Sequence, residues 1–367
     1  MSENAPQISI VIPTLNEAQN IGSLIPRIFA VCGDRGVYAE VIVVDDGSTD
    51  GTAEVVEGMM AGHRLQLVKR PAKMGITSAI LDGFQCATGA IVGGMDSDFS
   101  HPPEKIPELA EPILAGQADM TIASRYVKGG AVARWPLRRR LMSRTASRLS
   151  RPLTRVKDPM SGFFFVRKDL LKDVALSTRG WKICLEILVK ARPERVVEVP
   201  YTFTNRESGS SKMGLDTIGG FVVNLLDLYV HKFFGSSLGD FLRFGTVGGI
   251  GVFLNLAIVY LLVEFGHVWY VTSATASFFI VASNNFLWNK IWTFHDRRIQ
   301  PRIIGAQLGR FLASSIVSLG INLSALALLV EGLGLWYLLA QLLAIGVAVL
   351  ANFGLSSRWV FRGRKGH

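Results

Sequence analysis

The chain has 367 residues, enough for two or more domains. Hydrophobic residues make up 49% of it and the mean hydropathy is +0.32, which is high for a soluble protein and predicts membrane segments. The net charge of +10 suits nucleic acid or anionic lipid. Because the apolar residues gather in the last third, we expect lipid and no nucleic acid. Cys32, Cys86 and Cys184 are odd in number and scattered, which disfavours a disulfide framework and a cysteine metal site.

The first two thirds of the chain alternates short apolar stretches with helical ones. The N-terminus lacks a basic segment followed by a long apolar one, so we expect no signal peptide and a cytoplasmic soluble part. Strands are expected at 8–13, 41–45, 65–69, 90–95 and 120–124, and helices at 18–30, 52–60, 74–87 and 103–115. This order predicts a Rossmann-like α/β domain with a mostly parallel sheet. Dinucleotide-binding and P-loop glycine motifs are missing, which disfavours a hydride-transfer enzyme and a P-loop NTPase.

An acidic turn follows the second expected strand. The spacing of an EF-hand loop is matched at positions 1, 3, 5, 6 and 12 by Asp46, Ser48, Asp50, Gly51 and Glu57. However, the preceding residues 41–44 form a β-branched strand, whereas an EF-hand loop follows a helix. We therefore interpret Asp46 as a ligand-facing carboxylate at a strand end. Ser48, Thr49 or Asp50 would then cap the next helix.

Asp96-Ser97-Asp98 follows the fourth expected strand. Two carboxylates one residue apart form a hard-oxygen site for Mg²⁺ or Mn²⁺. Open α/β sheets bind ligands at the carboxyl ends of their strands, so a metal here would hold the diphosphate of a nucleotide-sugar. The alternative is an acidic surface turn, since Asp-x-Asp is a common sequence.

Residues 134–157 form a basic segment with interleaved apolar side chains. The basic residues are Arg134, Arg138, Arg139, Arg140, Arg144, Arg148, Arg151, Arg155 and Lys157. Trp135, Leu137, Leu141, Met142, Leu149 and Leu153 lie between them. This composition predicts an interfacial helix near 134–157, although a nucleic-acid patch or a solvated helix would also fit. Residues 215–234 are a second interfacial candidate, and together the two segments would frame a lipid headgroup.

Four stretches in the last third, near 244–263, 268–289, 311–330 and 332–357, contain no Asp, Glu, Lys or Arg. Each is long enough to span a membrane, and buried core helices are the alternative. The sequence also repeats at an offset of 67. For example, Arg243-Phe244 matches Arg310-Phe311, and Asn285-Phe286 matches Asn352-Phe353. We therefore predict an all-α transmembrane domain of four helices in two parallel repeats.

The charged loops predict how these spans are oriented. Arg243, residues 290–310 and the basic tail at 358–365 all fall on one side, whereas the hairpin tips carry Glu264 and Glu331. The positive-inside rule then places both termini and the catalytic domain of a multi-pass membrane protein in the cytoplasm. Asparagines in or near the ends of the spans are interpreted as bonds between helices rather than as a transport path.

Three motifs, at residues 12–17, 43–52 and 95–103, resemble those of family 2 glycosyltransferases. Residues 124–126, 135–140, 161–163, 180–182 and 205–212 extend the resemblance to the dolichol-phosphate mannose synthases. The duplicated segment is similar to the GtrA-like membrane domain. The resemblance implies a GT-A domain over 1–232, a GtrA-like domain over 238–367, and Mg²⁺ or Mn²⁺ as cofactor. It also implies metal-dependent, inverting transfer of mannose from GDP-mannose to a polyprenyl (dolichyl) phosphate, giving polyprenyl phosphate β-mannose.

The resemblance also implies roles for individual residues. The nucleotide pocket would be lined by Pro13, Leu15, Glu17, Val44 and Asp46. Sugar and metal would be held by Asp96, Ser97 and Asp98, with Ser100 beside the metal. Further contacts to phosphate or sugar would come from Arg125, Lys182, Arg206 and Lys212, and the acceptor phosphate would contact Arg139 and Ser143. Leu15 stands where relatives often have Tyr, and Ser100 where some have Gln.

A lipid phosphate acceptor would need no general base, because its second pKa is near 6 and it is largely a dianion at pH 7. One alternative is the same reaction with UDP-glucose. A processive polysaccharide synthase is another, but the Gln-x-x-Arg-Trp-type motif that it usually carries is missing. A third is a lipid-linked sugar transporter with a regulatory head, which the acidic strand ends and the aligned cations disfavour.

Overall fold

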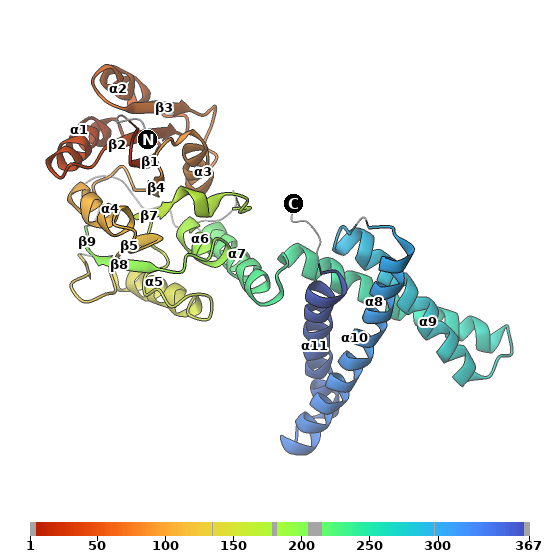
Figure 1. Cartoon of the computed structure of the whole chain (residues 1–367). Coiled ribbons are helices and arrows are strands. Elements are labelled where there is room, and N and C mark those ends of the chain that lie inside the picture. Colours follow the sequence, from red (N-terminus) through yellow and green to blue (C-terminus); the bar gives the residue numbers. More distant parts are fainter. Residues whose placement is uncertain (1–4, 134, 178–181, 205–214, 297, 363–367) are drawn as a thin grey trace. The chain divides into compact units, whose positions relative to one another are not determined.

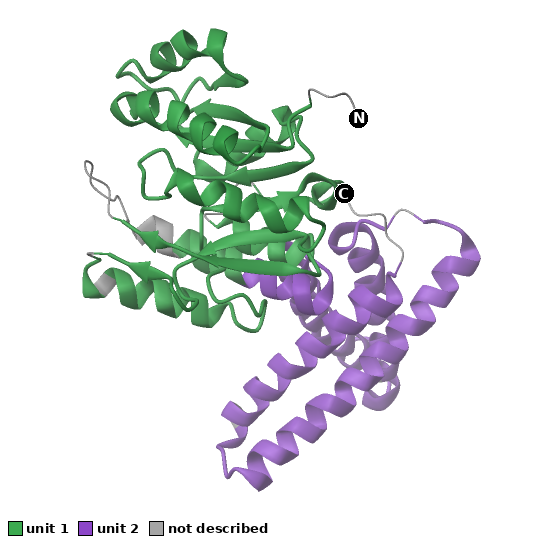
Figure 2. Ribbon diagram, turned by 60° about the vertical axis from the view of Figure 1, so that its left-hand side comes forward, with its two compact units in different colours: residues 1–225 green, residues 226–367 purple. Residues whose placement is uncertain are grey.

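The structure is a computed structural model, and it describes all residues except 1–4, 134, 178–181, 205–214, 297 and 363–367. The chain divides into two compact units, Met1–Leu225 and Leu226–His367. Figure 2 shows the two units in different colours. The predicted domain limits at 232 and 238 lie close to this division, within and just after the helix that crosses it, and they remain predictions.

Seven strands form the main sheet of the first unit, within the described residues, in the order β3-β2-β1-β4-β7-β5-β8. They are β1 (Ile8–Thr14), β2 (Ala39–Asp45), β3 (Leu65–Lys69), β4 (Ile91–Gly94), β5 (Met120–Ser124), β7 (Phe164–Arg167) and β8 (Val196–Pro200). All pairs are parallel except those of β7, which is antiparallel to both β4 and β5. Two short strands, β6 (Ala131–Val132) and β9 (Thr202–Phe203), pair beside it. The mostly parallel sheet is confirmed.

Helices cover both faces of this sheet, as Figure 1 shows. They are α1 (Ala18–Asp34), α2 (Thr52–Met59), α3 (Ile76–Cys86), α4 (Ile106–Leu114), α5 (Leu137–Leu149) and α6 (Ile183–Lys190). Alternate strand residues enter two cores. Ile10 packs in the core that holds α1, α2 and α4, whereas Val11 packs in the core that holds α3 and α6. Helix α3 lies close against β1 because Gly83 has no side chain: a Cβ there would lie 2.3 Å from Val11 Cγ1.

The second unit is helical. Helix α7 (Leu215–Phe234) crosses the division between the units and is followed by α8 (Leu238–Glu264), α9 (Tyr270–Trp288), α10 (Pro301–Ala327) and α11 (Tyr337–Leu355). In the described residues, three helical segments are long and apolar enough to cross a membrane: Leu238–Glu264, Pro301–Gly332 and Leu339–Val360. A membrane-spanning region is therefore shown, while a fourth span at α9 remains a prediction.

Two features of this unit recur 67 residues apart. The π-helical turn η4 (Asn289–Thr293) follows α9, and the π-helical turn η6 (Ser356–Val360) follows α11. Aromatic rings also pair in a reciprocal way. Phe286 stacks on Phe361 and Phe294 stacks on Phe353, each with ring centroids 5.9 Å apart, and Phe294 stacks on Phe361 at 4.7 Å. The corresponding phenylalanines of the two halves thus meet in one core.

Candidate active site

The candidate site lies where parallel strands of the first unit end together. Because β1, β2, β4 and β5 run in the same direction, the residues that follow them meet at one edge of the sheet. Strand β7 runs the other way, so the segment that precedes it, with Gly162, reaches the same edge. Motifs that are distant in the sequence are therefore brought together at this edge.

Hydrogen bonds connect the loops after β1 and β2. Asn16, which has a φ of +59°, donates its backbone N–H to Ser48 Oγ at 2.8 Å. One Asp50 oxygen accepts from Ala18 N at 3.0 Å and the other from Thr52 N at 3.1 Å. Asp50 therefore satisfies the first backbone amides of α1 and α2 together, and it fulfils the predicted capping role from one residue before the N-cap position. This edge of the pocket is held in place by the protein itself.

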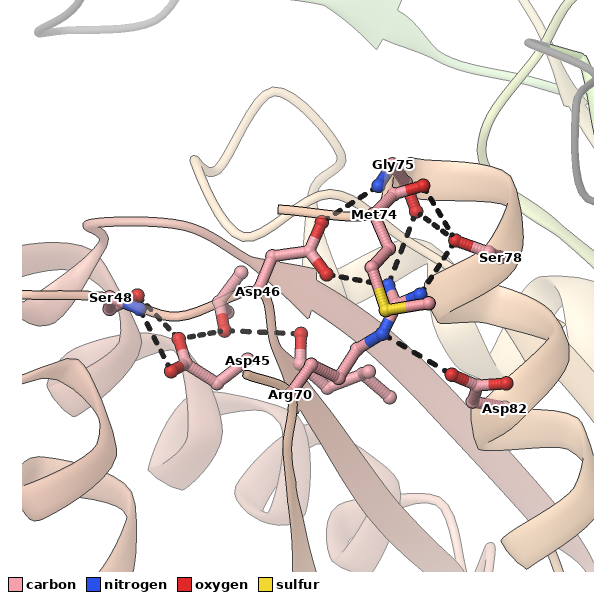
Figure 3. A network of polar contacts seen from close by, with 10 residues as sticks. Asp45, Asp46, Ser48, Arg70, Met74, Gly75, Ser78 and Asp82 are labelled. Atoms are coloured by element: carbon pink, nitrogen blue, oxygen red, sulfur yellow. Dashed lines mark hydrogen bonds and ion pairs between the residues drawn. The ribbon is translucent and has the colours of Figure 1, made fainter. Parts of the chain in front are cut away.

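Asp46 lies in the polar network of Figure 3. Its Oδ1 is 2.5 Å from Arg70 Nη1, and its Oδ2 accepts from Gly75 N at 3.0 Å. The guanidinium of Arg70 also donates to Ser78 Oγ at 2.7 Å and lies 3.3 Å from Asp82 Oδ2. Asp46 and Arg70 are 7% and 6% exposed. The Asp46 carboxylate is thus bonded within the protein at both oxygens, and a ligand would have to use its remaining lone pairs.

The other predicted nucleotide contacts differ in accessibility. Pro13, Leu15 and Glu17 are half-buried at the end of β1, where a ligand can reach them. Val44 is fully buried in the core beneath α3, so only its backbone faces the edge. The role of these residues in nucleotide binding remains a prediction.

The acidic pair after β4 is organised by a buried histidine. Asp98 Oδ1 accepts from Ser100 N at 3.1 Å, and Asp98 is 6% exposed. His101 Nδ1 accepts from Asp96 N at 2.9 Å, and His101 Nε2 lies 3.7 Å from Asp96 Oδ2. Burial lowers the pKa of His101, so the ring is neutral, and its proton is on Nε2 because Nδ1 accepts. The more exposed Asp96 is therefore oriented by its own loop, and Ser97 is buried beside it.

The donor set at this edge fits a hard divalent cation. Ser100 Oγ is buried and, among the described residues, has no hydrogen-bond partner. Together with Asp98 it offers oxygen ligands, which Mg²⁺ and Mn²⁺ prefer. In the described part of the chain no three His, Cys, Asp or Glu side chains gather to hold a metal alone. The residues therefore suit a metal that substrate phosphates help to hold.

Arg125, at the end of β5, is bound to a buried carboxylate. Its Nε and Nη2 donate to the two Asp158 oxygens at 2.7 Å each, and its backbone N–H donates to Asp158 Oδ2 at 2.9 Å. Asp158 holds the pKa of Arg125 above its ordinary value despite burial. Lys182 lies just before α6. Burial, with the nearby charge of Arg125, lowers its pKa to about 8.

Arg139 and Ser143 lie one turn apart on α5, where the acceptor phosphate is predicted. The Arg139 Cζ is 4.2 Å from the centroid of the Trp135 ring, and Ser143 Oγ accepts from Tyr126 Oη at 2.7 Å. Leu137 and Leu141 are 81% and 64% exposed, as an interfacial helix requires. Trp135 differs from that prediction: it is buried in the protein and does not face lipid.

Several residues of the site have partners that the sequence did not indicate. Asp158 and Arg70 belong to none of the sequence motifs. The structure reveals them because Asp158 pairs with Arg125 and Arg70 pairs with Asp46. The histidine of the third motif could have been noted from its place three residues after Asp98, but its role depends on the fold. Arg206 and Lys212 lie outside the described residues, so their predicted contacts remain predictions.

Comparison with known proteins identifies the family. Residues 9–175 match the family described as glycosyl transferase family 2, and residues 243–361 match the GtrA/DPMS transmembrane domain. The dolichol-phosphate mannosyltransferase of Pyrococcus furiosus is 36% identical over 95% of this chain and 96% of its own length. The chain belongs to the dolichol-phosphate mannosyltransferases of glycosyltransferase family 2.

Other members of the family match a smaller share of the chain. The dolichol-phosphate mannosyltransferase of Saccharomyces cerevisiae is 36% identical over 66% of this chain and 94% of its own. The polyprenol monophosphomannose synthase of Mycolicibacterium smegmatis is 36% identical over 56% of this chain and 80% of its own. Among solved structures, the glucosyl-3-phosphoglycerate synthase of Mycobacterium tuberculosis with Mn²⁺ and UDP has a TM-score of 0.46. It is 25% identical and covers 62% of this chain and 80% of its own. The protein is thus a membrane-associated mannosyltransferase.

Proposed function

We propose that this mannosyltransferase moves mannose from GDP-mannose to a membrane polyprenyl phosphate and inverts the anomeric centre. The observation that carries the proposal is an end-to-end match to a dolichol-phosphate mannosyltransferase. It is supported by cations and carboxylates that converge at one edge of the sheet. GDP as the nucleotide, the inversion and the metal are parts of this proposal.

In the proposed reaction an acceptor phosphate oxygen attacks C1 of mannose, and the bond from C1 to the diphosphate oxygen breaks. The electron pair leaves with GDP, and one sugar–phosphate ester replaces another. No proton has to be removed, because the acceptor phosphate is already largely a dianion at pH 7. The main task of the side chains is therefore to hold two anionic groups together, for which arginine is suited.

Asp98 and Ser100 are the residues proposed to hold the divalent cation, Mg²⁺ or Mn²⁺. When bound, the metal would neutralise negative charge on the diphosphate leaving group. Asp96, oriented by His101, is proposed to bind the sugar. Arg139 and Ser143 are proposed to bind the acceptor phosphate, and Lys182 a donor phosphate.

For the second unit we propose four spans in two parallel repeats, with both termini and the catalytic unit in the cytoplasm. Two observations support the repeats: the π-helical turns 67 residues apart and the reciprocal stacking of corresponding phenylalanines. Glu264 and Glu331 at the hairpin tips and the basic residues on the other side support the orientation.

An assay that compares two sugar donors tests the reaction. Purified full-length protein is incubated with polyprenyl phosphate and, separately, with radiolabelled GDP-mannose or UDP-glucose, and the lipid product is analysed. We expect label in the lipid only from GDP-mannose, loss of transfer with excess chelator, and no transfer to a polyprenol that lacks phosphate. If label entered the lipid only from UDP-glucose, the proposed donor GDP-mannose would be wrong and the donor would be UDP-glucose. An absence of transfer combined with passage of a lipid-linked sugar across vesicles would favour a transporter.

A further inference from the structure

Two arginine side chains share one aromatic platform beside the candidate site. The Cζ atoms of Arg139 and Arg125 lie 4.2 and 5.3 Å from the centroid of the Trp135 ring. They also lie 5.6 and 5.8 Å from the centroid of Phe203. All four distances are within the range of a cation–π interaction. The two guanidinium groups therefore contact the same two rings although their charges are alike.

The platform itself is fixed by the protein. Trp135 is 8% exposed and meets Phe203 edge to face at 5.2 Å. Phe203 lies on β9, which pairs with β6, and Trp135 follows β6 by three residues; between them Ala133 N donates to Phe203 O at 2.9 Å. Helix α5 begins two residues after Trp135, so Arg139 lies in its first turn, where backbone amides favour an anion. Trp135 thus stands between a rigid sheet and the start of the helix that carries Arg139.

The two arginines differ in how they are held. Arg125 is bound through two of its nitrogens to Asp158, and Asp158 is fully buried. Arg139 is half-buried on a helix with exposed neighbours. The indole face is the nearer of the two aromatic contacts of Arg139. It restricts the rotamers of the long arginine side chain, so that less ordering is needed when phosphate binds.

We propose that Trp135 is a positioning residue for the acceptor phosphate, acting through Arg139 by holding its guanidinium against the indole face. The inference rests on the proposed function, in which Arg139 binds the phosphate of the lipid. It assigns to Trp135 a task in acceptor use rather than in membrane contact or donor binding.

Substitution of the indole separates this task from others. We expect Trp135→Leu to raise the KM for polyprenyl phosphate about 2- to 30-fold, the range of one cation–π contact, with the KM for GDP-mannose changed less than about 2-fold. Trp135→Phe keeps an aromatic face without the indole N–H, and we expect it to recover most of the loss. Trp269→Leu, at an exposed tryptophan before α9, is the matched control and should change neither constant.

A double-mutant cycle tests whether the effect passes through Arg139. We expect Trp135→Leu combined with Arg139→Ala to be no worse than Arg139→Ala alone. Additive losses would show that Trp135 acts independently and would overturn the proposal. An equal rise in the KM for polyprenyl phosphate with Trp135→Phe and Trp135→Leu would overturn it too, because the indole N–H rather than the aromatic face would then be the group that matters.

Binding measured without turnover keeps this inference distinct from the proposed function. Calorimetric titration of the full-length protein with a short-chain prenyl phosphate should give a weaker Kd for Trp135→Leu than for the wild type, measured at a temperature at which thermal unfolding shows both proteins to be folded. Wild-type binding without sugar transfer would contradict the proposed reaction and leave the role of Trp135 standing. No wild-type binding, or equal binding by both proteins, would overturn that role.

Discussion

Two strands of the same sheet end in acidic pairs, and the carboxylates of the two pairs have different hydrogen-bond partners. After β2, both oxygens of Asp46 are bonded within the protein, to the buried Arg70 and to the Gly75 amide. After β4, Asp98 is fixed by the Ser100 amide, and the buried Ser100 hydroxyl beside it has no described partner. Two patterns that look alike in the sequence thus have different physical settings. A buried carboxylate with its own cation contributes to the fold, whereas one beside unbonded oxygen donors is suited to a ligand.

The same contrast applies to the cations. Arg70 is hydrogen-bonded to Asp46 and Ser78 inside the domain. Arg139 and Lys182, by contrast, lie at the edge where the substrates are proposed to bind, and Arg139 lies over the Trp135 ring. Substitution of Asp46 should therefore mainly lower stability, whereas substitution of Asp98 or Arg139 should mainly lower turnover.

The largest expected effect is on the β4 side. Asp98→Asn keeps the shape of the side chain and removes the charge proposed to hold the metal. We expect kcat to fall about 10²- to 10³-fold or more, with the melting temperature unchanged in the absence of ligand. Steady-state assays over a range of Mg²⁺ and Mn²⁺ concentrations, together with thermal unfolding, check this. Full activity of the variant, or of the wild type in excess chelator, would remove the metal from the proposal.

On the β2 side we expect the opposite result. Asp46→Asn leaves the buried Arg70 charge with only the partly exposed Asp82 as counter-ion, and the free energy of unfolding should fall by about 3–5 kcal/mol. Denaturant unfolding of the detergent-solubilised protein measures this. Asp82→Asn is the matched control, because the Asp82 side chain is 42% exposed and its contact to Arg70 should contribute about 0–1 kcal/mol. Equal effects of the two variants would contradict the contrast.

A smaller effect is expected at Arg139. Arg139→Ala should lower kcat/KM for the lipid acceptor about 10- to 150-fold, equivalent to roughly 1.5–3 kcal/mol for a charge-assisted hydrogen bond. Arg140, the next residue, is exposed and donates to Val132 O at 3.3 Å. Arg140→Ala should therefore cause only a small, salt-sensitive loss. Similar losses for both variants, removed alike by high salt, would show that Arg139 is one of many membrane-binding charges.

The smallest effect is a pH dependence set by Lys182. Its pKa of about 8 in the folded protein means that the phosphate-binding ammonium form is lost as pH rises through 8. Turnover should then decline by at most tenfold per pH unit, and Lys182→Arg should shift this decline to higher pH. Folding lowers this pKa from 10.5, so the charge destabilises the fold below pH 8, and the penalty is relieved between pH 8 and 10.5. Parallel changes in stability and activity would contradict this assignment.

The elements of the fold were largely predictable because their hydrophobic patterns are local. The five strands and four helices expected in the first part of the chain are all present, with ends shifted by a few residues. Strands β7 and β8 and helix α6 were not predicted, and the antiparallel place of β7 between β4 and β5 depends on contacts far along the chain.

The site was predictable at its motifs and less so at their partners. The acidic pairs stand out in the sequence, but Arg70 is 24 residues from Asp46 and Asp158 is 33 residues from Arg125, and neither has a local signal. Trp135 shows the limit of composition: within a basic segment it looked interfacial, whereas pairing of β6 with β9 buries it against Phe203.

The aromatic core of the membrane unit bears on how the protein is made. Its rings pair across the two halves, and Phe361 stacks on both Phe286 and Phe294 of the earlier half. A nascent chain delivers the first hairpin to the membrane well before Phe361 has been synthesised. Until then Phe286 and Phe294 of that hairpin lack Phe361 as a stacking partner. Completion of this core therefore requires the segment that carries Phe361, and a chain that stops shortly before it would keep the contacts of Phe353 but lose the stacking on Phe286 and Phe294.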